Sequence, residues 1–481
     1  MENNTKKNLG LQTVYQILST ALPLITAPYL ARVLGATQLG VFSYTSSVVA
    51  YFTLLAMLGT VNYGTRSIAV VKDNPTELSK TFWEIYWLQF FVSFVALLLY
   101  AVYLLFICKE NRIIALIQTT AIVSCFFDIN WLFFGIENFK ITVTRSIIIR
   151  FATVAAILLF VKSKNDLWLY TLLMLGSILA SQAILWVYAP KYVHFTRVKL
   201  RGIQSHLCPN ILLFIPLVAM SVYHTMDKTM LGLLSTYEQT GFYYNADKVI
   251  NIPLGILTGI GTVMLPKMTA LINTGKREAA DHLYIISMEG VTAISCAMTF
   301  GIAAISKEFV PFFFGEGYDC CILLTIVLSP VIIIKGFSNT ARTQYLIPLK
   351  MEKVFTQSVF AGAITNLISN AILIPRAGAI GAAIGTLFAE CISCLWQFIY
   401  MKATINLKRC FLNCLAYLIN GIIMFVVVRI VANISIPIVF RLIMEIGVGS
   451  IIYIVTCFLF WKFTMNDMYK VIFKGFSSEE R

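Results

Sequence analysis

Long apolar runs recur along the whole chain, and they constrain its fold more than any other feature. A bilayer core about 30 Å thick needs roughly 20 apolar residues for each helix that crosses it. Lipid can absorb this much apolar surface, whereas a single soluble core cannot. About fourteen candidate spans can be delimited, at 11–34, 38–62, 82–107, 113–136, 141–162, 167–189, 207–233, 238–265, 282–305, 319–345, 353–374, 377–400, 411–432 and 438–462. We therefore expect an all-α integral membrane protein of about fourteen transmembrane helices.

The composition agrees with a chain that lies almost entirely in lipid. Of the 481 residues, 58% are hydrophobic and 12% are charged, about half the charged fraction of an ordinary soluble protein. The net charge of +14 would suggest nucleic acid in a soluble protein, but the sequence has no soluble basic module to bind one. The first apolar run follows the polar segment MENNTKKNLG and shows no small-residue cleavage site. It therefore predicts a retained span and not a removed signal peptide.

The distribution of basic residues predicts the orientation. With both termini in the cytoplasm, the tails and cytoplasmic loops hold 22 of the 37 Lys and Arg residues, the opposite side holds nine, and six fall inside spans. Basic residues collect on the cytoplasmic side of membrane proteins. This bias favours cytoplasmic termini. It also supports an even number of spans, because one missed span would scramble the alternation.

The longest polar stretch, from Pro190 to His206, divides six predicted spans from eight. It predicts an N-lobe over 1–189, a cytoplasmic linker over 190–206, a C-lobe over 207–400, and two further helices with a cytoplasmic tail over 401–481. The segments VLGATQLGVFSY (33–44) and LSTYEQTGFYYN (234–245) align at a constant offset of 201, so that Gly40 matches Gly241. Both segments occupy the first two spans of a half. This indicates a parallel repeat and two pseudo-symmetric six-helix lobes.

Charged residues inside the spans carry the functional signal, since a charge at mid-bilayer costs from about 2.5 to well over 10 kcal/mol. The basic ones are Arg145, Arg150, Lys228, Lys248, Lys335 and Arg342, and the acidic ones are Asp128, Asp227, Asp247, Glu289, Glu390 and Glu445. Several polar residues fall into helical stripes, namely Lys335–Asn339–Arg342, Tyr244–Asp247–Lys248–Asn251 and Tyr44–Ser47–Tyr51. Such faces must look at each other or at water, not at lipid.

Two interpretations of these stripes remain open. In the first, the charges form interhelical pairs, such as Asp227 with Lys248, that lock helices together. In the second, they line an aqueous cavity. Cations pair with phosphate, and aromatic faces suit sugar rings, so such a lining suits a bulky, polar, anionic substrate. The cavity is favoured for the set as a whole, because pairing alone would tend to balance the charges and these rows are rich in cations.

No pattern in the sequence indicates an enzyme. The chain has no nucleotide-binding GxxxxGK[ST] sequence and no catalytic constellation. Cys391-x-x-Cys394 lies in an apolar segment without a second Cys pair or a His cluster, so we expect neither a metal nor another cofactor. The pairs Gly255-x-x-x-Gly259 and Gly381-x-x-x-Gly385 are expected to serve close helix packing.

Four segments resemble the bacterial polysaccharide-repeat flippases, the Wzx family of the multidrug/oligosaccharidyl-lipid/polysaccharide exporter superfamily. They are PYLARVLGATQLGVFSYTSSVVAYF (28–52), WLFFGIENFKITVTRS (131–146), MDKTMLGLLSTYEQTGFYYNADKVI (226–250) and QYLIPLKMEKVFTQSVFAGAITNLISNAILIPRAGAIGAAIGTLFAE (344–390). The resemblance implies two six-helix lobes around a central cavity, two peripheral helices, and alternating access in the bacterial cytoplasmic (inner) membrane.

The resemblance also implies a substrate and partners. The substrate is undecaprenyl diphosphate carrying one oligosaccharide repeat, turned from the cytoplasmic to the outer leaflet for an O-antigen, a capsule or a similar polysaccharide. The transport is expected to be coupled to an H+ or Na+ gradient or to the membrane potential. Membrane lipid, a polysaccharide polymerase and a chain-length regulator are the expected partners.

Together, the intramembrane residues and the resemblance define a candidate site. Its predicted substrate-binding residues are Arg32, Arg66, Arg145, Lys228, Tyr244, Asn245, Lys248, Lys267, Lys335, Asn339 and Arg342. Asp128, Asp227 and Asp247 are predicted to couple to an ion or to pair with the lumen cations. The alternatives are a multidrug or cation antiporter of the same superfamily, a lipid II flippase of the same fold, and a structural scaffold whose charges all pair. The two extra spans and the cationic rows weigh against the antiporter.

Overall fold

The computed structural model describes residues 2–402 and 407–464, with side chains for all of these except 2–21, 23, 216 and 407–412. Every regular element within these ranges is a helix, which confirms the all-α fold class. Eleven helices are long and apolar enough to cross a membrane, or twelve if the pair 200–215 and 217–234, bent by 47°, is one span. The protein is therefore a multi-pass membrane protein. The predicted cytoplasmic tail beyond residue 464 lies outside the described ranges.

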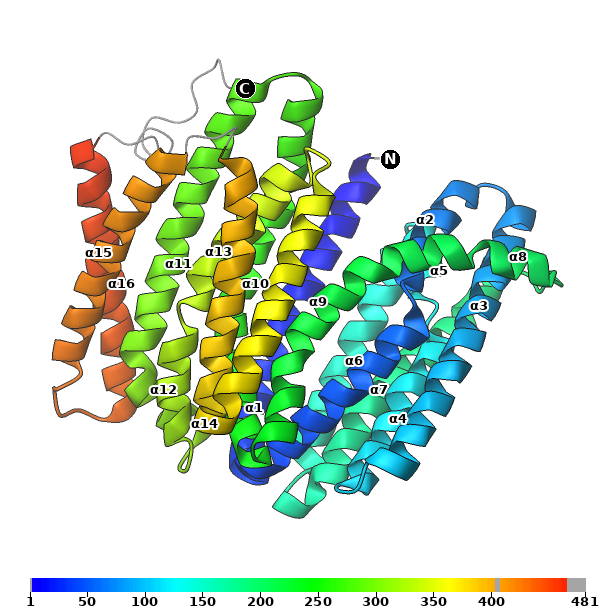
Figure 1. The fold of residues 1–481 in the computed structure, drawn as a ribbon, viewed down its shortest axis with the longest axis horizontal. Coiled ribbons are helices and arrows are strands. Elements are labelled where there is room, and N and C mark those ends of the chain that lie inside the picture. Colours follow the sequence, from blue (N-terminus) through cyan, green and yellow to red (C-terminus); the bar gives the residue numbers. More distant parts are fainter. Residues whose placement is uncertain (1, 403–406, 465–481) are drawn as a thin grey trace. The chain divides into compact units, whose positions relative to one another are not determined.

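The chain forms two compact units, Met1–Gly241 and Phe242–Arg481 (Figure 1). The helices of the N-terminal unit are α1 (Glu2–Met57), α2 (Thr60–Val71), α3 (Pro75–Val102), α4 (Arg112–Phe127), α5 (Asn130–Gly135), α6 (Phe139–Phe160), α7 (Leu167–Tyr188), α8 (Leu200–Ser205) and α9 (Leu207–Leu234). The helices of the C-terminal unit are α10 (Tyr237–Asn273, its first turn in the N-terminal unit), α11 (Arg277–Phe314), α12 (Asp319–Leu328), α13 (Val331–Ala341), α14 (Glu352–Met401), α15 (Leu407–Val431) and α16 (Ile438–Thr464). Short π or 3-10 turns are η1 (Tyr103–Ile107), η2 (Lys164–Asp166), η3 (Ala189–Lys191) and η4 (Arg342–Leu346).

Helix α14 contains two of the predicted spans, 353–374 and 377–400. Its backbone is non-helical at Gly378, where φ is 54° and ψ is −130°. Residues 370 and 385 would lie about 22 Å apart in a straight helix. A Cβ built on Gly385 would instead lie 2.3 Å from Asn370 Oδ1. The helix therefore folds back on itself at Gly378. The expected close packing of Gly381 and Gly385 is confirmed, whereas a Cβ on Gly259 would touch nothing within 4 Å.

In the N-terminal unit, the predicted span 113–136 is interrupted at the charge it contains. Asp128 has an extended backbone between α4 and α5, and its side chain accepts a hydrogen bond from Asn130 N at 3.0 Å. Such a break leaves helix carbonyls that lipid cannot satisfy. Gln89 of α3 satisfies two of them, donating to Cys125 O at 2.6 Å and to Asp128 O at 2.9 Å.

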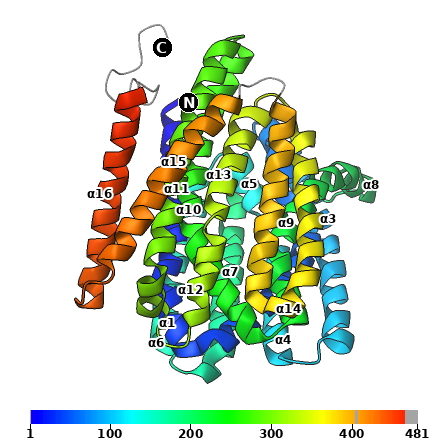
Figure 2. The same cartoon turned by 60° about the vertical axis from the view of Figure 1, so that its left-hand side comes forward.

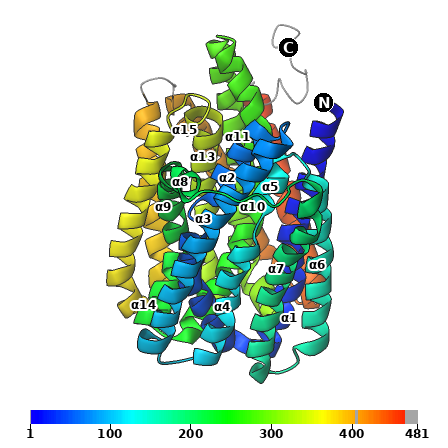
Figure 3. The same ribbon diagram turned by 90° about the vertical axis from the view of Figure 1, so that its right-hand side faces the viewer.

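The helices of the N-terminal unit pack side by side in the order α3, α4, α7, α6 (Figure 3). At the end of this unit that the sequence predicts to be cytoplasmic, large buried side chains form a hydrophobic core. They include Phe82, Trp131 and Leu185. Outside the spans at this end, Lys72 Nζ donates to Glu137 Oε1 at 2.7 Å, and this hydrogen bond raises the pKa of Lys72.

Helix α9 packs against α1 in the same unit. The polar stripe of α1 faces it, since Thr229 Oγ1 donates to Ser47 Oγ at 2.8 Å and lies 3.2 Å from the Tyr51 hydroxyl. A Cβ on Gly232 of α9 would lie 2.1 Å from the Tyr44 ring. This stripe is therefore used in helix packing. The two compact units divide after α9 and not at 190–206. This division does not test the lobe boundary predicted at 190–206, which stays a prediction.

The repeat at an offset of 201 produces a reciprocal backbone contact. A Cβ on Gly40 would lie 1.6 Å from Tyr237 O, and a Cβ on Gly241 would lie 1.9 Å from Ala36 O. Ala36 and Tyr237 are themselves separated by the repeat offset. Each contact is therefore the image of the other, which is what a pseudo-two-fold between the segments requires. Only glycine permits two helices to approach this closely.

In the C-terminal unit, α10 and α11 are 37 and 38 residues long. Each corresponds to about 55 Å, well beyond a bilayer core of about 30 Å. Figure 1 shows the hairpin between them extending past the other helices of this unit. Helices α15 and α16 pack on α11 and on each other and lie at one edge of the unit (Figure 2).

The reciprocal contact makes a prediction about glycine substitutions. Gly40→Ala and Gly241→Ala should each destabilise the protein by about 1–3 kcal/mol, because a methyl group would be forced against a carbonyl. The two losses should be similar, since the contacts are images of each other. Thermal unfolding of the purified protein in detergent measures this, with Gly259→Ala as the matched control that meets open space. If Gly40→Ala unfolds at the same temperature as the control, the contact is not a tight one.

Candidate functional site

The predicted site residues divide between the two units, and each unit is described by itself. The N-terminal unit contains Arg32, Arg66, Asp128, Arg145, Asp227 and Lys228, and the C-terminal unit contains Tyr244, Asn245, Asp247, Lys248, Lys267, Lys335, Asn339 and Arg342. Arg32, Arg66 and Lys267 are exposed, whereas Asp227 and Asn245 are buried.

Arg145 of α6 lies at the centre of a polar network in the N-terminal unit. It is buried, and its guanidinium donates to the Ser181 carbonyl of α7. The same group donates to Asn130 Oδ1 of α5 at 3.1 Å and to Ser146 Oγ at 3.2 Å. Three helices are therefore joined through one intramembrane cation.

Asp128 is connected to this network through amide side chains. Its Oδ1 accepts from Asn130 Nδ2 at 2.8 Å, and its Oδ2 accepts from Gln182 Nε2 at 3.1 Å. Asn130 also donates to Gln182 Oε1 at 2.8 Å. Asn130 therefore bridges a carboxylate and the guanidinium of Arg145. This arrangement reduces the cost of both charges in a low-dielectric environment.

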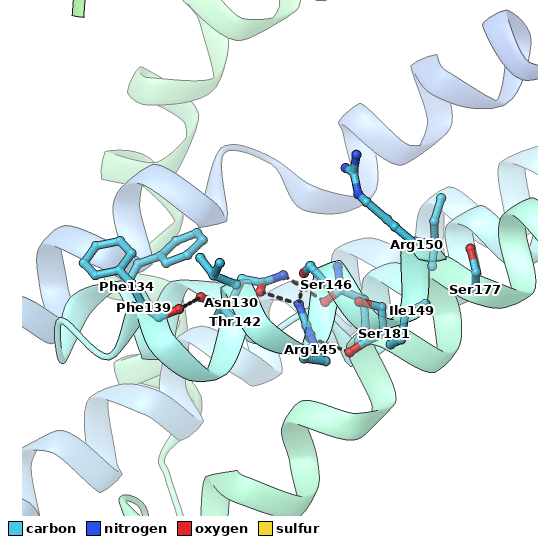
Figure 4. A pocket seen from close by; sticks show the side chains of 13 residues that line it. Asn130, Phe134, Phe139, Thr142, Arg145, Ser146, Ile149, Arg150, Ser177 and Ser181 are labelled. Carbon is cyan, nitrogen blue, oxygen red and sulfur yellow. Dashed lines mark hydrogen bonds between the residues drawn. The ribbon is translucent and has the colours of Figure 1, made fainter. Parts of the chain in front are cut away.

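A cavity of about 320 Å³ opens beside this network between α5, α6 and α7 (Figure 4). The figure shows Arg145 turned toward Asn130 and Ser181, with Arg150 extending from the next turn of α6. The polar residues that line the cavity are Asn130, Thr142, Arg145, Ser146, Arg150, Ser177, Ser181 and Gln182. Two arginines among hydroxyl and amide groups suit a phosphorylated or polyhydroxylated molecule. Arg150 was predicted to lie in a span, but the sequence did not place it in the site.

In the C-terminal unit, Lys335 forms an ion pair with a buried carboxylate. Its Nζ lies 3.0 Å from Glu390 Oε1 of α14, and the Glu390 side chain is 5% exposed. The predicted stripe of Lys335 with Asn339 and Arg342 is therefore divided, because Lys335 has a carboxylate partner. For this residue, the interpretation as an interhelical pair holds.

Arg342 differs from Lys335 in this respect. Its guanidinium donates to Asn339 Oδ1 at 3.0 Å and lies 5.3 Å from the centre of the Phe355 ring. Within the described ranges, no carboxylate lies at ion-pair distance from it. Arg342 also begins the π-helical turn η4, a local form that is frequent at functional sites. It is a half-buried cation that no carboxylate of the described residues neutralises.

Asn339 connects this cation to α10. Its Nδ2 donates to Leu257 O at 3.4 Å, and a Cβ on Gly261 would lie 2.8 Å from the same nitrogen. The absence of a side chain at Gly261 therefore lets α10 approach the start of η4. Farther toward the start of α10, Lys248 Nζ lies 3.9 Å from the centre of the Tyr244 ring, a cation–π contact. Among the described carboxylates, none pairs with Lys248, and Asp247 instead accepts from Asn251 Nδ2 at 2.9 Å.

Comparison with known proteins shows the family of this chain. A family model described as polysaccharide biosynthesis protein matches residues 5–272, more than half of the chain. The chain belongs to this family. A putative O-antigen transporter of Escherichia coli (strain K12) is 24% identical over 395 residues, covering 80% of this chain and 94% of that protein. A putative O-antigen transporter of Shigella dysenteriae is 26% identical over 408 residues, covering 82% and 100%.

A solved structure shares the fold of this family member. The lipid II flippase MurJ in an inward closed conformation superposes with a TM-score of 0.79 at 16% identity, covering 94% of this chain and 99% of that one. The resemblance to the polysaccharide-repeat flippases and the expected transporter fold are both confirmed.

Two partly buried polar clusters in this member of the polysaccharide biosynthesis protein family were not predicted from the sequence. His206 lies 3.1 Å from Glu84 Oε2 through Nε2 and 2.6 Å from the Tyr63 hydroxyl through Nδ1. Arg429, near the end of the predicted span 411–432, pairs with Glu308 Oε2 at 2.7 Å. The partners lie more than 100 residues apart in each case. No local pattern signals such a pair.

The Lys335–Glu390 pair can be tested by a double-mutant cycle. Lys335→Met should destabilise the protein by about 3–5 kcal/mol, because it leaves the Glu390 carboxylate buried without its cation. Adding Glu390→Gln should recover most of this loss, since neither buried charge then remains. Thermal unfolding in detergent measures both effects. Additive losses in the double variant would mean that the two side chains do not act as a pair.

Proposed function

We propose that this protein is a flippase for lipid-linked oligosaccharides. It turns undecaprenyl diphosphate carrying an oligosaccharide repeat from the cytoplasmic to the outer leaflet of the bacterial cytoplasmic membrane, by alternating access, with both termini in the cytoplasm. Family membership and the two putative O-antigen transporters support a carrier for surface polysaccharide precursors.

One observation carries the proposal, the presence of intramembrane cations that the described protein carboxylates do not neutralise. Arg342 and Lys248 have polar or aromatic neighbours in place of a carboxylate. A cation in this setting is costly unless an anion joins it. A diphosphate supplies that anion and forms strong, charge-assisted hydrogen bonds with guanidinium.

The cavity beside Arg145 and Arg150 supports the same substrate class. Its hydroxyl and amide lining offers donors and acceptors to sugar hydroxyl groups, and Phe134 and Phe139 add aromatic faces. A volume of about 320 Å³ accommodates a sugar-sized group and not a whole repeat unit. The remaining sugars would occupy other parts of the lumen.

Energy coupling belongs to the proposal as well. Asp227 is buried in α9, and Asp247 lies in the polar row of α10, so both remain candidates for coupling to an H+ or Na+ gradient. Asp128 is a weaker candidate, because amide donors already occupy both of its carboxylate oxygens. A polymerase and a chain-length regulator remain the proposed partners.

Transport can be tested with variants that remove one cation at a time. Arg342→Gln and Lys248→Gln should each reduce surface polysaccharide at least about tenfold, because each loses a charged hydrogen bond to the diphosphate. Arg150→Gln should reduce it because it loses a charged hydrogen bond to a sugar hydroxyl group. The measurement is the polysaccharide made by a strain that lacks its own flippase and expresses each variant at equal level. Arg376→Gln is the matched control, since Arg376 is exposed and its guanidinium donates to Ile372 O of its own helix.

The opposite outcome is as informative. Normal polysaccharide from all three variants would remove these cations from the substrate site. Resistance to toxic cations in a strain overexpressing the protein, without restored polysaccharide, would favour the antiporter instead.

A further inference from the structure

Glu445 of α16 is a buried carboxyl group to which no group in the described part of the chain donates a hydrogen bond. The residue is 0% exposed. Neither of its carboxyl oxygens has a hydrogen-bond partner within the described ranges. Buried polar groups almost always have partners, so an orphaned carboxyl needs a physical explanation. It lies in a span, far from the polar rows of the proposed substrate site in sequence.

A separate cavity of about 450 Å³ adjoins this carboxyl group between α11, α15 and α16. Its lining is predominantly aliphatic and includes Met298, Ile305 and Val428. Tyr453 also lines it, but the Tyr453 hydroxyl is already committed to Ala293 O at 2.7 Å. An ionised carboxylate would have little to stabilise it in these surroundings.

Within the described residues, Glu445 forms no ion pair, although three charged groups interact with it electrostatically. They are Glu308 of α11, Arg429 of α15 and Arg441 of α16. Arg429 donates to Glu308 Oε2 at 2.7 Å and to Ala304 O at 2.9 Å. Arg441 donates to Ile436 O at 3.2 Å. In this structure, therefore, Arg429 is paired with Glu308, and two carboxyl groups compete for it.

From this geometry we propose that Glu445 is a proton-binding site that exchanges its proton when Arg429 changes partner. In one state, Glu445 carries the proton and Arg429 pairs with the Glu308 carboxylate, as observed. In the other state, Glu445 has released its proton to water and Arg429 is shared between the two carboxylates. One proton leaves and no other bond changes. The site joins α11 to the α15–α16 pair, so its proton occupancy is linked to how these helices pack.

Labelling with dicyclohexylcarbodiimide tests the proposal on the purified full-length protein in lipid nanodiscs. This apolar reagent reacts with protonated carboxyl groups in membrane-embedded sites and leaves ionised ones unmodified. Peptide mass spectrometry should find the adduct on Glu445 at low pH. The labelled fraction should fall about tenfold for each pH unit above its midpoint. Glu445→Gln should abolish this adduct. The assay needs no transport, so its outcome is independent of the proposed substrate.

Two further variants separate proton exchange from simple accessibility. Glu308→Gln frees Arg429 for Glu445, so labelling of Glu445 at a given pH should decrease. Looser packing alone would increase it. Arg429→Gln removes the shared cation, so labelling of Glu445 should persist to higher pH. Size-exclusion profiles identical to that of the native protein establish that each variant is folded. The proposal is overturned if Glu445 is never labelled, if its labelling is independent of pH, or if Glu308→Gln increases it.

Discussion

The cost of a charge in hydrocarbon is the constraint on which this structure depends. Lipid offers a charged side chain neither water nor counterion, so each such residue must find a partner within the protein or from a ligand. The described chain uses several solutions. Lys335 and Glu390 pair directly, Asp128 and Arg145 are bridged by Asn130, and Lys248 lies over an aromatic ring. Among the described residues, the guanidinium of Arg342 contacts an amide oxygen and a ring face, with no carboxylate at ion-pair distance.

These solutions separate structural charges from candidate functional ones. A paired charge contributes specificity to helix packing, and its removal leaves the partner stranded. A cation without a protein anion is instead poised to accept an anionic ligand, and a diphosphate is such a ligand. Glu445 is the corresponding case for an acidic side chain. Because no described group donates a hydrogen bond to its carboxyl oxygens, a bound proton is the simplest way to neutralise it. Paired charges are therefore expected to affect stability when substituted, and unpaired charges to affect the binding of the substrate or of a proton.

The sequence predicted most of the fold, because hydrophobic length and turn residues are local signals. The two spans within α14 were predicted from apolar periodicity. The repeat that matches Gly40 with Gly241 was also predicted, but the contact between its two copies came from the structure. The partners of the charges could not be predicted in the same way. Lys335 shares a helical face with Arg342, yet only the tertiary structure brings Glu390 to Lys335. In the same way, only the tertiary structure brings Glu308 to Arg429.

The central claim is that unpaired intramembrane cations bind the diphosphate, whereas paired ones do not. The most direct measurement is the affinity of the purified protein for a polyprenyl diphosphate oligosaccharide, determined by native mass spectrometry in lipid. The account predicts that Arg342→Gln weakens binding about 10- to 100-fold, the value of a charge-assisted hydrogen bond. The double variant Lys335→Met/Glu390→Gln should bind like the native protein. Unchanged affinity in Arg342→Gln, with a large loss in the double variant, would contradict the account.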